Sequence, residues 1–172
     1  MGMVGALMLL GEGLLRGSNA RSAGPLVGTL ELLYLGGWMG SLVGMGHSRA
    51  TGQSRSGRAV LVIQAIGLCL AALFTIWEAL SAGRVTGSLL YELANVAWPF
   101  SHLFMIALGI ATLRAKVWRG WRRFTPLLCG LALPISLLAG AVGIGGGIWG
   151  PFAILTAAAF LLLGYAVATG GS

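Results

Sequence analysis

The sequence has few charged side chains, and negative charge is almost absent from it. Its 172 residues include four glutamates, no aspartate and eleven lysines and arginines, so that only 9% of the chain is charged. Soluble domains carry about 25% charged residues, whereas 57% of this chain is hydrophobic. The composition excludes a soluble globular protein and indicates a protein of the lipid bilayer.

The residues that hold metals and cofactors are also scarce. Cys69 and Cys129 lie in separate apolar segments and form neither a CxxC pair nor a metal-spaced cluster. A haem between helices needs two buried histidines, and only His102 lies inside an apolar segment, since His47 falls at the end of one. The glycine run within 141–152 follows an apolar helix and not a strand, which excludes a dinucleotide loop. The sequence therefore predicts no metal site and no cofactor.

Apolar stretches follow one another with only short polar breaks between them. A helix needs about 20 apolar residues to cross the hydrocarbon core, and six stretches approach or reach that length. The predicted fold is an all-α, polytopic bundle of about six transmembrane helices, forming a single domain over 1–172. The predicted spans are 1–15, 25–45, 59–82, 93–113, 125–142 and 149–168.

Positive charge is distributed unequally between the breaks. The second and fourth breaks carry eight basic residues, whereas the first and third carry Arg16, Arg21 and Arg84. The positive-inside rule places the richer breaks, and with them both termini, in the cytoplasm, and the composition favours a prokaryotic inner membrane. This rule and the attraction of anionic headgroups explain the net charge of +7, so no nucleic acid partner is expected. The eight residues are Arg49, Arg55, Arg58, Arg114, Lys116, Arg119, Arg122 and Arg123.

With this topology all four glutamates fall in the outer half of the membrane. Helical spacing places Tyr91, Asn95, Trp98 and His102 on one face of the fourth span. It also aligns Gln64, Ala71, Thr75 and Glu78 in the third span, and Glu31, Tyr34 and Trp38 in the second. Polar groups inside a membrane are costly and often functional. The hypothesis is a ligand pocket in the outer half, formed by Glu31, Glu78, Asn95, Trp98 and His102.

The alternative is that these polar groups only form hydrogen bonds between helices and fix how the helices pack. Small residues that favour close packing recur at Gly36, Gly40 and Gly44, a GxxxGxxxG pattern. This row would contact either a neighbouring span or a second protein chain in a homo- or hetero-oligomer.

Three functions remain open at the level of sequence. The first is a transport or sensing protein of the bilayer that binds a small apolar or cationic molecule, a lipid or an ion in the outer pocket. The second is an acid–base enzyme, an isomerase or cyclase of a lipid or terpenoid, with Glu31 or Glu78 as proton donor and Trp38, Trp77 and Trp98 lining its pocket. The third is an accessory subunit of a larger membrane complex.

Overall fold

The computed structural model describes residues 2–17, 25–81, 89–144 and 149–169, and all of their regular structure is helical. The predicted all-α bundle is confirmed, and each predicted span coincides with a helix whose ends differ by no more than four residues. The predicted ends at residues 1 and 82 lie outside the described residues. The helices are α1 (Gly2–Gly17), α2 (Pro25–His47), α3 (Arg55–Ser81), α4 (Leu89–Ala115), α5 (Thr125–Ala141) and α6 (Trp149–Thr169), with a short 3-10 helix η1 (Gly120–Phe124) before α5.

Five helical stretches, α2, α3, α4, η1 with α5, and α6, are long and apolar enough to cross a membrane, which marks the chain as a membrane-spanning protein. The first helix is shorter, with 16 residues. Sixteen residues rise about 24 Å, less than the roughly 30 Å of the hydrocarbon core. Of the six predicted spans, five therefore lie in helical stretches long enough to cross the core, the fifth only when η1 is counted with α5, and the first lies in a shorter helix.

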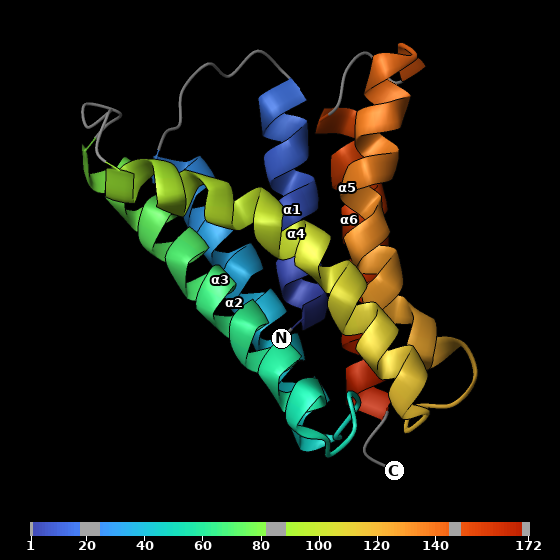
Figure 1. Cartoon of the computed structure of the whole chain (residues 1–172). Coiled ribbons are helices and arrows are strands. Elements are labelled where there is room, and N and C mark those ends of the chain that lie inside the picture. Colours follow the sequence, from blue (N-terminus) through green and yellow to red (C-terminus); the bar gives the residue numbers. More distant parts are fainter. Residues whose placement is uncertain (1, 18–24, 82–88, 145–148, 170–172) are drawn as a thin grey trace.

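The six helices form a ring in which neighbours in sequence are neighbours in space, and α1 closes the ring by packing between α2 and α6 (Figure 1). Two connections, 48–54 and 116–119, lie at the same end as the last residues of α6 (Figure 1). The indole Nε1 of Trp118 donates a hydrogen bond to Ser48 Oγ at 3.2 Å, and Arg122 Nη1 donates to the carbonyl oxygen of Thr169 at 3.0 Å. We call this end, which carries the eight basic residues named above, the basic end.

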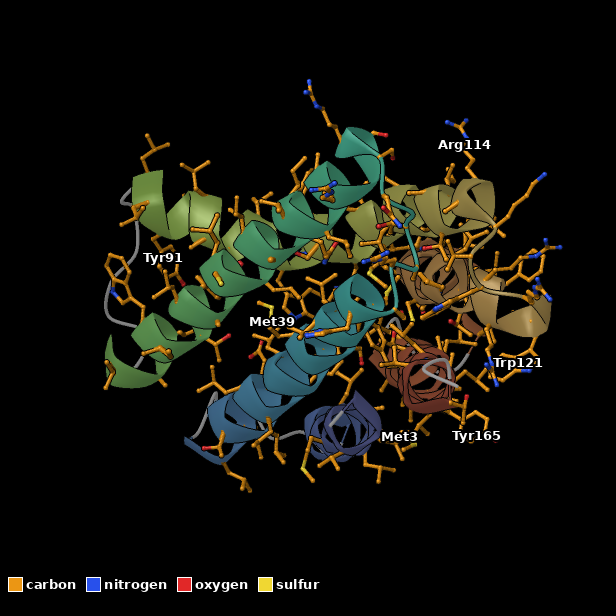
Figure 2. The ribbon with its side chains drawn as sticks, turned by 90° about the horizontal axis from the view of Figure 1, so that it is seen from below. Met3, Met39, Tyr91, Arg114, Trp121 and Tyr165 are labelled. Atoms are coloured by element: carbon orange, nitrogen blue, oxygen red, sulfur yellow. The ribbon has the colours of Figure 1, made fainter. Side chains whose placement is uncertain are left out.

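Figure 2 views the molecule from the basic end, where Trp121 and Tyr165 lie together at one edge. Their rings are stacked, with centroids 6.0 Å apart and an interplanar angle of 11°. Tryptophan and tyrosine prefer the headgroup level of a bilayer. The connection 116–119 and η1 are thus joined to Ser48, directly after α2, and to the end of α6.

Close helix contacts depend on glycines that face a neighbouring backbone. A Cβ added to Gly5 of α1 would lie 3.0 Å from the Cα of Gly37 in α2. One added to Gly109 of α4 would lie 2.6 Å from the Cα of Leu127 in α5, and Gly130 meets the backbone of Ile106 in the same way. In lipid such close approach replaces the hydrophobic effect as a source of helix association.

Gly36 and Gly44, two members of the predicted GxxxGxxxG row, do not share one contact surface. Gly44 faces Val167 of α6, which is a contact within the chain. Gly36 is exposed, and a Cβ there would meet no heavy atom within 4 Å. The tight contact between α1 and α2 uses Gly37 instead, and association with a second chain through Gly36 stays a prediction.

We expect Gly109→Ala to lower the free energy of unfolding by about 1–3 kcal/mol, the usual cost of overpacking a close contact. The added methyl group would overlap the backbone of Leu127. The matched control is Gly36→Ala, whose methyl group has open space and which favours the helix. Thermal unfolding in detergent measures both variants. Equal destabilisation by the two substitutions would contradict the close α4–α5 contact.

Candidate functional site: an aromatic cluster around His102

His102 lies at the middle of α4 and is 0% exposed. Its Nδ1 lies 3.2 Å from the carbonyl oxygen of Trp98, one turn earlier, and its Nε2 lies 3.0 Å from the hydroxyl of Tyr34 in α2. A carbonyl oxygen can only accept, so Nδ1 carries the hydrogen and donates it. The Tyr34 hydroxyl then donates to Nε2. Both ring nitrogens are used, and in the neutral imidazole this arrangement selects one tautomer.

Aromatic rings surround this imidazole on several sides. The ring centroids of Trp98, Trp38 and Phe152 lie 4.3, 4.6 and 5.3 Å from that of His102. Phe160 packs edge-on against both Trp38 and Tyr34, at 4.8 and 5.4 Å. We call these six residues the aromatic cluster: Tyr34, Trp38, Trp98, His102, Phe152 and Phe160.

The aromatic cluster fills the middle of the helix ring from three alternate helices, α2, α4 and α6. Among the described residues, the backbone of α4 makes no close contact with α2 or with α6, and large rings bridge the space between them. Tyr34 and Trp98 each follow the first residue of their helix by nine positions, about 14 Å, and Phe152 follows Trp149 by three. These helix ends are opposite the basic end. The cluster therefore extends from the centre of the bundle toward the opposite end.

Two donors in the cluster have no acceptor among the residues that the structure describes. The indole Nε1 groups of Trp38 and Trp98 are buried and make no hydrogen bond in the described part of the chain. A buried polar group left without a partner costs roughly 1–3 kcal/mol. Unlike the fully used nitrogens of His102, these two N–H groups can bind an acceptor that enters the cluster.

Of the five residues predicted to form the pocket, the structure brings Trp98 and His102 together. Asn95 is exposed, one turn before Pro99. Glu31 is half-buried on α2, one turn beyond Tyr34 toward the end opposite the basic end, and Glu78 is half-buried near the end of α3. None of these three belongs to the six residues of the cluster, and their role in binding stays a prediction.

The buried polar groups of the face predicted for α3 form hydrogen bonds to backbone carbonyls. Gln64 is buried, and its Nε2 donates to the carbonyl oxygen of Ser101 at 3.2 Å. The hydroxyl of Thr75 bonds the carbonyl of Ala71 in its own helix. The hydrogen bond of Gln64 joins α3 to α4, and that of Thr75 stays within α3. The packing alternative predicts such bonds for polar groups inside the bundle. Trp77, also on α3, lines an apolar hollow beside α4 instead of the cluster.

Sequence reasoning missed Phe152 and Phe160. Helical spacing had already aligned Tyr34 and Trp38 with Glu31, so the contribution of α2 was visible. In α6, by contrast, apolar residues occur on every side, and periodicity does not distinguish an inward face. The one available signal was the eight-residue spacing of the two phenylalanines, which places them on one face two turns apart.

We expect Tyr34→Phe to destabilise the protein by roughly 1–3 kcal/mol, because it leaves Nε2 of His102 buried without a donor. His102→Leu should also destabilise it, and the double variant should lose less than the sum of the two. The control is Tyr165→Phe on the exposed surface of α6. Thermal unfolding of the parent, the two single variants and the double variant measures the coupling between Tyr34 and His102. Strict additivity would exclude the hydrogen bond between Tyr34 and His102.

Among the described residues no three His, Cys, Asp or Glu side chains gather as a metal site requires. Comparisons with protein-family models, with curated proteins and with solved structures found no match. The chemistry of the aromatic cluster is therefore the basis on which a function can be argued.

Proposed function

We propose that the protein is a transport or sensing protein of the bilayer that binds a small, uncharged, largely apolar molecule carrying a hydrogen-bond acceptor. The ligand would lie in the aromatic cluster. The observation that carries this proposal is the pair of buried indole N–H groups, on Trp38 and Trp98, that find no acceptor among the described residues and flank a fully hydrogen-bonded His102.

The groups of the cluster favour an acceptor over a cation. Aromatic faces attract cations, but within the six cluster residues the two polar groups that find no partner in the described chain are both donors, whose positive ends would repel a cation. The six cluster residues also include no carboxyl group to balance its charge. A carbonyl or ether oxygen would accept from one indole N–H while the rest of the molecule contacts the rings.

Entry of a ligand requires rings to move, because those of Trp98, His102 and Phe152 are in contact. Trp98 is partly exposed, and Phe152 lies in the first turn of α6. Rotation of these two side chains would open the cluster from the end opposite the basic end. Small-molecule sites in helical bundles are commonly built from side chains on facing helices.

For the binding test we choose two probes of the same shape, fluorenone, which has a carbonyl acceptor, and fluorene, which has none. Fluorenone should stabilise the protein more strongly against thermal unfolding, since a ligand stabilises the state that it binds. Trp38→Phe and Trp98→Phe each remove one N–H and keep an aromatic ring. Each should weaken the binding of fluorenone about fivefold to tenfold, the value of one hydrogen bond of roughly 1–1.5 kcal/mol.

The matched control is Trp121→Phe at the basic end, outside the cluster, which should bind fluorenone as the parent does. Benzyltrimethylammonium serves as a cationic probe. Equal binding of fluorenone and fluorene, or a preference for the cation that persists in both tryptophan variants, would overturn the proposal. Absence of all binding would favour the packing alternative.

We propose further that the basic end faces the cytoplasm of a prokaryotic cell, with the protein in the inner membrane. The support is the concentration of basic residues there, while the four glutamates lie on helix segments distant from it. The aromatic cluster then extends into the outer half of the membrane.

The orientation can be tested with an impermeant maleimide on whole cells that produce a variant without Cys69 and Cys129. Gln53→Cys, in an exposed connection of the basic end, should react only after the cells are opened. Val142→Cys, exposed just after α5, should react on intact cells. The reverse pattern would invert the orientation.

A further inference from the structure

A groove opens between α3 and α4 at the basic end, with a volume of about 610 Å³. Its mouth is polar and includes Arg114 together with residues 51–54, 56 and 57. Its inner wall is apolar and consists of Val60 from α3 and Ala107, Ile110 and Ala111 from α4. The lining therefore changes from polar to apolar in the direction that leads into the membrane.

Further apolar residues line the contact between α3 and α4, which we call the seam. A second hollow of about 410 Å³ includes Ile63 and Leu70 of α3 and Phe100 of α4. From Val60 to Leu70 the helix rises about 15 Å, which is half of the roughly 30 Å hydrocarbon core. The two hollows together place apolar side chains along α3 over a length close to the thickness of one leaflet, beginning beside the polar mouth.

The charge at the mouth has one sign. Arg114 is one of the lining residues, and its side chain points away from the bundle (Figure 2). Arg55 stands between Ser54 and Ser56, two of the lining residues, and is exposed. All four glutamates lie elsewhere in the sequence, on segments far from this end. An anionic group is therefore the complement of the mouth.

We propose that this groove binds one anionic phospholipid. Its phosphate would lie against Arg114 and the hydroxyls of Ser54 and Ser56, and one acyl chain would follow the seam between α3 and α4. A free phosphate would leave the apolar wall without a partner. A helix of another protein would place no anion at the mouth. The phospholipid matches both halves of the lining.

Native mass spectrometry of the detergent-solubilised protein, titrated with defined lipids, tests the site. Phosphatidylglycerol should bind more tightly than phosphatidylethanolamine or phosphatidylcholine. Arg114→Gln should weaken phosphatidylglycerol binding about fivefold, as expected for one arginine near an anionic headgroup. Its matched control is Arg119→Gln, an exposed residue of the same end outside the groove, which should bind as the parent does.

The apolar wall is tested by Ala107→Leu, which fills the groove without changing charge. This variant should also bind phosphatidylglycerol less tightly, whereas Ala158→Leu, on the exposed face of α6, should not change binding. An excess of inorganic phosphate should not displace the lipid. Equal losses in Arg114→Gln and Arg119→Gln would indicate diffuse charge and overturn the site. Displacement by phosphate with no effect of Ala107→Leu would indicate a free-anion site and would overturn it as well.

Discussion

Helices in lipid cannot be held together by the exclusion of water, and this constraint governs the whole structure. The described helices meet where glycine lets backbones approach, as Gly5 meets Gly37 and Gly109 meets Leu127. Most contacts of this kind join neighbours around the ring. They leave the middle of the ring to be filled by side chains from α2, α4 and α6.

Large aromatic side chains fill the centre of the helix ring, and several of these side chains carry polar groups. The hydrogen bonds of His102 to Tyr34 and to the backbone of Trp98 satisfy one set of these groups. The N–H groups of Trp38 and Trp98 find no acceptor in the described part of the chain. Phenylalanine at these two positions would fill similar space without that cost, which is why the indoles are the strongest argument for a ligand.

The two ends of the bundle differ in chemistry. The basic end joins its connections to α2 and α6 through Trp118 and Arg122, and it presents arginines beside the groove of α3 and α4. The aromatic cluster extends toward the other end. The proposed lipid site and the proposed ligand site are therefore separate, and the tests of one leave the other unaffected.

The sequence alone determined the apolar spans, the segregation of charge and the common face of Trp98 and His102, because each follows from composition or from the period of one helix. Tertiary structure decided which faces meet. Periodicity aligned Asn95 with His102, yet Asn95 is exposed, and Pro99 between them cannot donate the hydrogen bond that would continue the helix at the carbonyl of Asn95. Phe152 and Phe160 joined the cluster from a helix that is apolar all round. A helix's own period cannot identify its partner, since that depends on how six helices close into a ring.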